Sequence, residues 1–244
     1  MAVLVVGASA ATGKLLVNHL LKAGQLVKVV VRPDSKIPDN WSREENLTLI
    51  RRNVSEIGLN EMSNYLADCE AAASCLGHNL TLQGIYGNPR KLVTKAVQLL
   101  SEAILSTAPA KPFKFILMNT AGNSNRDLDE PVSIGQKIVI NMLRFLLPPH
   151  SDNEAAAEYL RVQIGKENPY LQWVVVRPDS LTNEENVSEY TLHTSPIRDV
   201  IFNPGQTSRI NAGYFMAKLI MDHGLWEKWK GQMPVIYNKV EKTK

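Results

Sequence analysis

The residues in this chain best suited to chemistry form a turn of small side chains near the amino terminus. The turn is Gly7-Ala8-Ser9-Ala10-Ala11-Thr12-Gly13, between an apolar run at 2–6 and a helical pattern that begins at Leu15. Small side chains let backbone amides approach a pyrophosphate, and the following helix points its positive amino end at that group. We therefore predict a dinucleotide site formed by Gly7, Ser9, Ala10, Ala11, Thr12 and Gly13.

The turn has two other interpretations. A P-loop needs the pattern G-x-x-x-x-G-K-[ST], whereas here five residues separate Gly7 from Gly13 and Leu15 follows Lys14. Ala10 fills the middle place of a G-x-x-G-x-x-G pattern, and its methyl group leaves less room between the backbone and a bound pyrophosphate. A tight turn that only connects a strand to a helix remains the simpler alternative.

An arginine indicates which dinucleotide is bound. Arg32 follows the apolar run at 26–31 and lies 19 residues beyond Gly13. An acidic residue at this place accepts hydrogen bonds from a ribose hydroxyl, whereas arginine can bind a 2′-phosphate through two charge-assisted hydrogen bonds. We expect NADP rather than NAD. Asp34 keeps NAD open, and Arg32 could be only a surface residue at a strand end.

Apolar runs alternate with helical patterns along the chain, which predicts the elements that position these residues. We expect strands at 2–6, 26–31, 47–50, 71–76, 113–118, 172–176 and 233–237, and helices within 15–24, 83–105, 134–147 and 154–163. This order predicts an α/β fold with a doubly wound parallel sheet of the NAD(P)-binding Rossmann type. Residues 1–244 form a single domain, and 119–152 and 181–232 form a small substrate region because they follow strand ends.

Several longer motifs add a resemblance. They are GASAATG at 7–13, VVVRP at 29–33, RRNV at 51–54, SCLG at 74–77, LMNTAG at 117–122, EAAAEYLR at 154–161, VVVRPDSL at 174–181 and SRIN at 208–211. In order and spacing the chain resembles the atypical short-chain dehydrogenase/reductase superfamily, in its NAD(P)H-binding branch of biliverdin reductase B/flavin reductase-like proteins. The resemblance implies a reductase that transfers hydride from NADPH to a small organic acceptor.

The resemblance also implies roles by position. Asn53 and Val54 would lie at the adenine, with Asn53 where aspartate is common. Thr120 stands at the place of the family's active-site serine or threonine. The remaining positions would line the cofactor: Cys75, Leu76, Gly77, Asn119, Arg177, Pro178 and Leu181. Cys75 could equally be a small residue of the core.

The superfamily's usual Tyr-x-x-x-Lys pair is missing. Glu154 stands at the lysine place and His150, four residues earlier, at the tyrosine place. With an ordinary pKa near 6.5, histidine can donate a proton, so His150 joins Thr120 as a candidate catalytic residue; a loop histidine is the alternative. Tyr214 and Lys218 repeat the spacing, but they follow the sixth strand and are interpreted as a coincidence. Glu154 and Glu158 could form a carboxylate pair, although such helical pairs are usually solvated.

Three functions therefore stay open. The first is the reductase, with Tyr190 and His193 lining its substrate pocket. The second is a non-catalytic NADP(H)-binding redox sensor or scaffold, for which the apolar helix face of Ile134, Ile138, Met142 and Leu146 would be a docking surface. That face could instead cover the sheet or form a homodimer contact. The third, weaker function is a sugar-nucleotide epimerase or dehydratase.

Composition limits the partners. The chain has 244 residues, 44% of them hydrophobic, and its 27 basic and 24 acidic residues nearly balance, which does not favour nucleic acid. No apolar run reaches the length of a membrane span, so no membrane partner is expected. Cys69 and Cys75 have no metal-type spacing around them, so we expect no metal and a reducing, cytoplasmic setting. Because neither nucleic acid nor a membrane is favoured, the expected partner is a small-molecule substrate.

Overall fold

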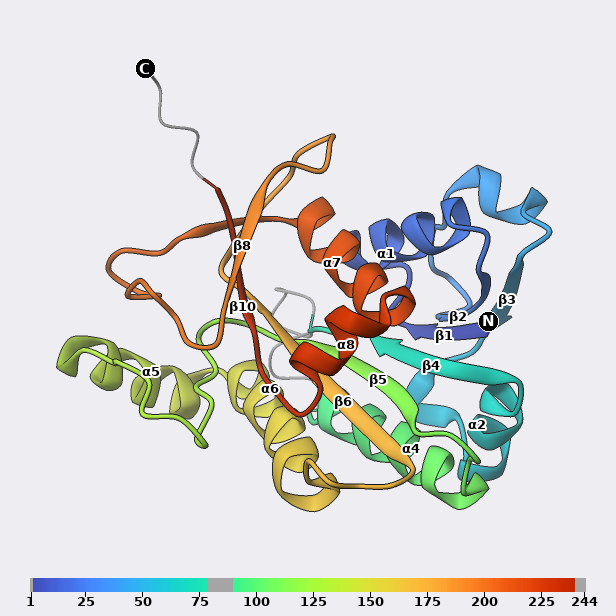
Figure 1. Ribbon diagram of the computed structural model, residues 1–244, viewed down its shortest axis with the longest axis horizontal. Coiled ribbons are helices and arrows are strands. Elements are labelled where there is room, and N and C mark those ends of the chain that lie inside the picture. The colour runs from blue at the N-terminus through green and yellow to red at the C-terminus, as the bar shows by residue number, and fades with distance from the viewer. Residues whose placement is uncertain (1, 79–89, 240–244) are drawn as a thin grey trace.

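A computed structural model describes residues 2–78 and 90–239, and its centre is one large sheet (Figure 1). Eight strands follow the order β3-β2-β1-β4-β5-β6-β10-β8. Their bounds are β1 Ala2–Val6, β2 Leu26–Val31, β3 Leu47–Arg51, β4 Cys69–Ser74, β5 Phe113–Met118, β6 Leu171–Pro178, β8 Tyr190–His193 and β10 Val235–Asn238. All neighbours are parallel except β10 and β8. The predicted α/β fold with a doubly wound, mostly parallel sheet is confirmed.

The central strands are apolar on both sides because helices cover both faces of the sheet. All five residues of β1 are buried, with Val3 and Val5 in one core cluster and Leu4 and Val6 in the other. The first face is covered by α1 (Ala11–Lys22), α7 (Arg209–Met221) and α8 (His223–Trp229). The second face is covered by α2 (Leu59–Leu66), α4 (Leu92–Thr107) and α6 (Pro148–Glu158).

The seven predicted strands are all present, displaced by no more than two residues at their starts. The sequence did not predict β8, nor the two-stranded sheet of β7 (Ser180–Thr182) and β9 (Gln206–Ser208). These strands have three or four residues each, too few for a period to be read, and most of their residues are partly exposed. Two 3-10 turns, η1 (Asp39–Arg43) and η2 (Val54–Glu56), flank β3.

The helices differ more from prediction. The helix expected at 154–163 begins six residues earlier, at Pro148, as α6, and continues as a π-helical turn, η3 (Tyr159–Ile164). Proline fits the first turn of a helix because its missing N–H has no helical partner there. Of the helix expected within 83–105, residues 83–89 lie outside the described residues, and α4 spans the rest. The apolar helix is α5 (Ile134–Leu146). Within residues 2–78 and 90–239, no helix is both long and apolar enough to span a bilayer.

Candidate functional site

The glycine-rich turn lies where the strand order reverses, between β1 and β4. Gly7 has φ +72°, in the left-handed region, and a Cβ there would lie 2.6 Å from the carbonyl carbon of Cys75 at the end of β4. A Cβ on Gly13 would lie 2.3 Å from the carbonyl oxygen of Gly7. Both glycines are therefore required for the turn to close against its neighbours. In open α/β sheets this point is where ligands bind.

The amino end of α1 is open to a ligand. Ala10 precedes the helix and offers no side-chain cap, and the first turn contains no acidic residue. Ala10 and Ala11 are exposed, whereas Thr12 is only 4% exposed. Backbone N–H groups of a helix's first turn have no helical partner, so they can bind an anion. The turn fits the pyrophosphate of a dinucleotide, with Ser9 partly buried beside it.

Two arginines lie beyond the adjoining strands. Arg32 follows β2 and is exposed. Arg51, the last residue of β3, pairs in register with Val31. Its Nη1 donates to the carbonyl oxygen of Pro33 at 2.9 Å, so it lies against the same turn. Sequence reasoning missed Arg51, although the R-R-N-V motif contained it.

The other cofactor positions lie at the same edge of the sheet. Asn53 directly precedes η2 and donates to Glu56 at 2.9 Å, and Val54 packs partly buried against the core. Cys75 is 5% exposed, and burial raises the pKa of its thiol to about 12, so it is not a reactive thiolate. Leu76 packs on the core, and a Cβ on Gly77 would meet nothing within 4 Å.

The structure brings the two candidate catalytic residues together. A Cβ built on Gly122 would lie 3.7 Å from Thr120 Oγ1 and 3.8 Å from His150 Cε1. The loop is held by Asn119, whose amide donates to the carbonyl of Asn153 on α6 at 2.8 Å and accepts from the Thr120 N–H at 2.9 Å. Thr120 and His150 therefore face one small space beyond the carboxyl end of β5.

The residue at the lysine place is an ion-paired carboxylate. Arg144 of α5 donates to both oxygens of Glu154, at 2.7 Å from Nε and 2.9 Å from Nη2. His150 Nε2 lies 3.4 Å from Glu154 Oε1 without making a hydrogen bond to it. Burial would raise the pKa of Glu154, but His150 and Arg144 outweigh it and lower the pKa to about 2. Glu154 is 9% exposed, which differs from the solvated pair expected with Glu158; Glu158 instead pairs with Arg161.

Every N–H donor of the Arg177 side chain is hydrogen-bonded within the protein. Its guanidinium pairs with Glu130, at 2.7 Å from Nη2, and also bonds the carbonyls of Met233, Asn123 and Thr194. Together with its second bond to Glu130, this occupies all five N–H donors, and the side chain is 0% exposed. Its side chain therefore has no donor left for a cofactor. Its neighbour Pro178 accepts from the Ala121 N–H at 2.9 Å, and Leu181 lies in β7.

A buried histidine follows the predicted cofactor-lining stretch and was missed. His78 Nε2 lies 2.7 Å from Asp152 of α6. The same carboxylate accepts from the N–H groups of Val93 and Thr94 and from the Thr94 hydroxyl, so it also caps α4. No local pattern could have predicted this contact, because His78 and Asp152 lie 74 residues apart in the chain.

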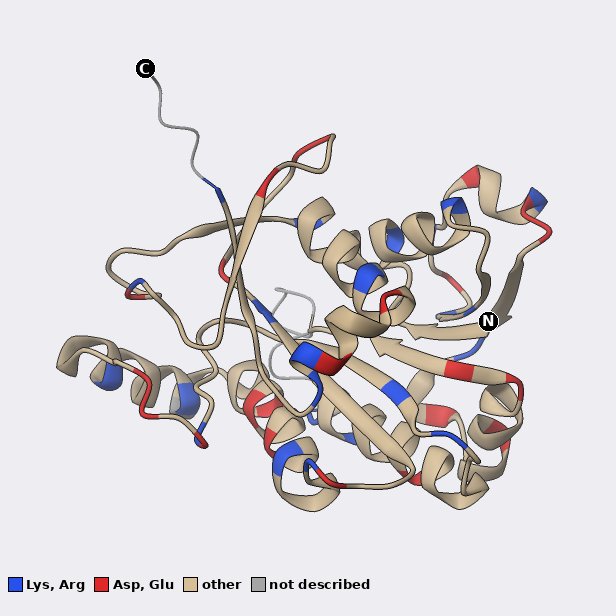
Figure 2. Cartoon of the chain, viewed as in Figure 1, with Lys and Arg blue, Asp and Glu red and all other residues tan. Residues whose placement is uncertain are grey.

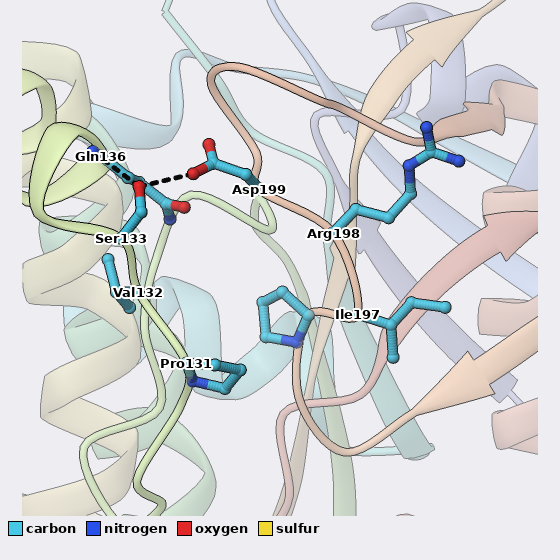
Figure 3. Close-up of a pocket in the computed structure, with 8 residues that line it drawn as sticks. Pro131, Val132, Ser133, Gln136, Ile197, Arg198 and Asp199 are labelled. Carbon is cyan, nitrogen blue, oxygen red and sulfur yellow. Dashed lines mark hydrogen bonds between the residues drawn. The ribbon is translucent and has the colours of Figure 1, made fainter.

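A shallow pocket opens between the two segments expected to bind substrate (Figure 3). Its volume is about 450 Å³, and its lining comes from Pro131, Val132, Ser133, Gln136, Pro196, Ile197, Arg198 and Asp199. Ser133 caps α5 and donates to Asp199 at 2.6 Å, which ties the two walls together. Neither Tyr190 nor His193 is in this lining; Tyr190 packs near Tyr214, and His193 near Tyr237.

The second Tyr-x-x-x-Lys lies on α7, which packs against α1. Tyr214 contacts the ring of His19, and Lys218 lies 3.7 Å from Asp222. These side chains are thus engaged with α1 and with the end of α7, and not with Thr120 or His150. These contacts agree with the interpretation of the Tyr-x-x-x-Lys spacing as a coincidence.

Solved structures with the same fold include several NAD(P)-related proteins. A short-chain dehydrogenase/reductase from Veillonella parvula, in complex with NADP, is 14% identical with a TM-score of 0.69, covering 97% of this chain and 94% of its own. A Streptococcus pneumoniae protein assigned provisionally as an NADH-flavin reductase is 18% identical with a TM-score of 0.66, covering 98% and 100%. A Bacillus halodurans protein, provisionally an NAD-dependent epimerase/dehydratase, is 20% identical with a TM-score of 0.70, covering 98% and 94%. No curated protein matches the sequence significantly.

Family membership agrees with the geometry of the turn. The sequence matches the NAD(P)H-binding family over residues 7–223, from the first glycine of the turn to the start of α8. The match spans α1 through α7 and includes Gly7, Gly13, Thr120 and His150. It confirms the resemblance to NAD(P)H-binding reductase-like proteins drawn from the motifs. The chain belongs to the NAD(P)H-binding family.

Proposed function

We propose that this protein is an NADPH-dependent oxidoreductase that reduces a small organic acceptor without a Tyr/Lys pair. The observation that carries the proposal is the shared space of Thr120 and His150, both within 4 Å of a Cβ built on Gly122. That space lies beyond β5, two strands from the glycine turn that follows β1. Reduced NADP would supply the hydride when bound, and the chain's own residues would orient the acceptor and supply the proton.

The choice of NADP over NAD rests on charge at the end of β2. Arg32 has its guanidinium exposed, and Arg51 lies against the same turn through Pro33. A 2′-phosphate carries a charge that two arginines can neutralise, whereas a ribose hydroxyl offers none. Asp34 is also exposed in this turn, and it would favour NAD if Arg32 pointed elsewhere.

His150 is the proposed proton donor. His150 lies in the first turn of α6. Thr120 lies on the other side of the Gly122 position, and Glu154 lies one helical turn further along α6. The Glu154 carboxylate, whose pKa lies at about 2, is ionised and places a negative charge 3.4 Å from His150 Nε2. Thr120 Oγ1 accepts from the Gly122 N–H at 3.2 Å, which leaves its hydroxyl proton to orient an acceptor's carbonyl or ring oxygen.

The test is turnover measured as NADPH oxidation with a panel of flavins, quinones and aldehydes. We expect activity with at least one acceptor and a loss of about 100-fold in kcat for His150→Ala, the usual scale of general acid catalysis. His223→Ala is the matched control, because that histidine starts α8. An unchanged rate and pH profile in His150→Ala would assign proton supply to solvent and remove His150 from the mechanism.

A redox sensor is the second candidate. The observation that favours it is the ion pair at the lysine place, since Glu154 held by Arg144 cannot bind a nicotinamide ribose as lysine does. Tight NADPH binding, with no turnover across the whole panel, would support the sensor and contradict the reductase. A sugar-nucleotide epimerase or dehydratase has no such observation in its favour.

A further inference from the structure

One helix carries an apolar face that the described residues of its own chain leave exposed. On α5, Ile134, Ile138, Met142 and Leu146 are 79%, 63%, 53% and 48% exposed. Residues four apart are turned by about 40° from one another, so these four form one stripe roughly 120° wide. The opposite side of the helix faces the body through buried Gln136 and Ile140. A stripe of this width normally faces a core.

One residue of a neighbouring loop, Phe202, extends the stripe. A Cβ on Gly135 would lie 2.9 Å from a ring carbon of Phe202, so this ring rests on the first turn of α5. Phe202 is itself 65% exposed. The α5 face consists of Ile134, Ile138, Met142, Leu146 and Phe202.

Hydrogen bonds to Asp199 hold the loop in this place. Asp199 Oδ1 accepts from the N–H of Phe202 at 2.9 Å, and Oδ2 accepts from Ser133 at 2.6 Å. The Gln136 amide, correctly oriented, donates to the same carboxylate at 3.2 Å. These hydrogen bonds join the loop to the first turn of α5, and five of the twelve large hydrophobic side chains exposed in the described chain lie on the α5 face.

We infer that the α5 face binds a second copy of this chain. Five such side chains, each exposing on the order of 100 Å², offer about 500 Å² of apolar surface, which is near the size of the largest patch on a typical single chain, and a stable dimer buries about 800 Å² per partner. A two-fold axis near the middle of α5 places two antiparallel helices together. Ile134 then faces the partner's Leu146, and Ile138 faces the partner's Met142.

Charge argues against an anionic membrane as the occupant. The sequence of α5 contains two cations, Lys137 and Arg144, which are the blue positions on this helix in Figure 2. Arg144 is already bound by Glu154. Helices that lie on anionic lipid carry many lysines and arginines on the polar face. Here the face is uncharged at its centre, as the core of a protein interface is.

Analytical ultracentrifugation of the full chain at micromolar concentration tests the inference. We expect twice the 27.2 kDa chain mass for the natural protein, and a monomer for Ile138→Asp/Met142→Asp. Burying these carboxylates against a partner should raise the dissociation constant at least about 100-fold. Val162→Asp is the matched control, since Val162 is 52% exposed but lies outside the face, and it should remain a dimer.

A cross-linking experiment locates the interface. In Ile138→Cys/Met142→Cys, a short bismaleimide should join two chains, because the two positions face each other across the axis. Native Cys69 and Cys75 are buried, which leaves the natural protein uncross-linked as the control. A monomeric natural protein, or a dimer that survives Ile138→Asp/Met142→Asp, overturns the inference. Flotation of the natural protein with phosphatidylserine vesicles, lost in that variant, would assign the face to lipid instead.

Discussion

A methyl group on Gly13 would lie 2.3 Å from the Gly7 carbonyl oxygen, closer than any real Cβ contact. Gly13→Ala must therefore push the glycine turn away from α1, and we expect a loss of about 3 kcal/mol or more in the free energy of unfolding. Gly58→Ala is the control, because a Cβ at Gly58 would meet nothing within 4 Å. Urea unfolding followed by circular dichroism measures both; equal losses would show that the close approach is not what constrains Gly13.

Arg32 tests cofactor choice at the residue scale. Arg32→Ala should weaken NADPH binding about 10- to 100-fold, the value of a charge-assisted hydrogen bond, and leave NADH binding nearly unchanged. Isothermal titration calorimetry with each coenzyme measures the difference. Arg43→Ala removes an exposed arginine from η1, away from the strand end, and serves as the control. If both coenzymes lose affinity equally, the 2′-phosphate assignment fails.

At the scale of elements, the sequence predicted the helices and strands that have a repeating apolar pattern. It did not predict the short strands or the contacts between residues far apart in the chain. Apolar runs predicted seven strands of the sheet because buried parallel strands are uniformly apolar. The same patterns could not predict β8 or the β7–β9 pair. The exposed stripe of α5 was visible as a helical period, but a period does not say which surface covers it. The arginine that reaches Glu154 comes from another helix, and no local spacing reveals such a contact.

The tie between α5 and α6 gives a pH-dependent prediction. The pKa of Glu154 is about 2 when folded and 4.5 ordinarily, so its contribution to stability is complete above pH 4.5 and is lost as pH falls toward 2. The natural protein should exceed Glu154→Gln by up to about 3 kcal/mol near neutral pH, with the two converging in acid. Urea unfolding at several pH values measures the gap.

Arg144→Met provides the control for this prediction. Without Arg144, the carboxylate loses its bidentate partner, so Glu154→Gln in that background should change stability less than it does alone. Sites in one ion-pair network are expected to couple in this way. If the difference in unfolding free energy stays constant from neutral pH to acid, Glu154 titrates alike in the folded and unfolded chain. That result would contradict a stabilising ion pair between Glu154 and Arg144.

At the scale of the whole molecule, the substrate side is assembled around one buried ion pair. Arg177 on β6 joins the loop after β5, the loop after β8 and the segment before β10, through Asn123, Thr194 and Met233. The R-P-x-x-L resemblance pointed to this residue for a different reason, as a neighbour of the nicotinamide. Only the folded chain shows that Glu130, 47 residues away, completes its set of acceptors.

Removing Glu130 should therefore damage several segments at once. Glu130→Ala leaves the Arg177 charge buried without its carboxylate, which costs about 3–5 kcal/mol of unfolding free energy. Replacing both partners, as in Arg177→Met/Glu130→Met, leaves no buried charge and should cost less than the single change. Urea unfolding gives both values, and limited proteolysis should cut Glu130→Ala first within 123–133. A single variant within about 1 kcal/mol of the natural protein would mean that the carbonyl acceptors alone hold Arg177 in place.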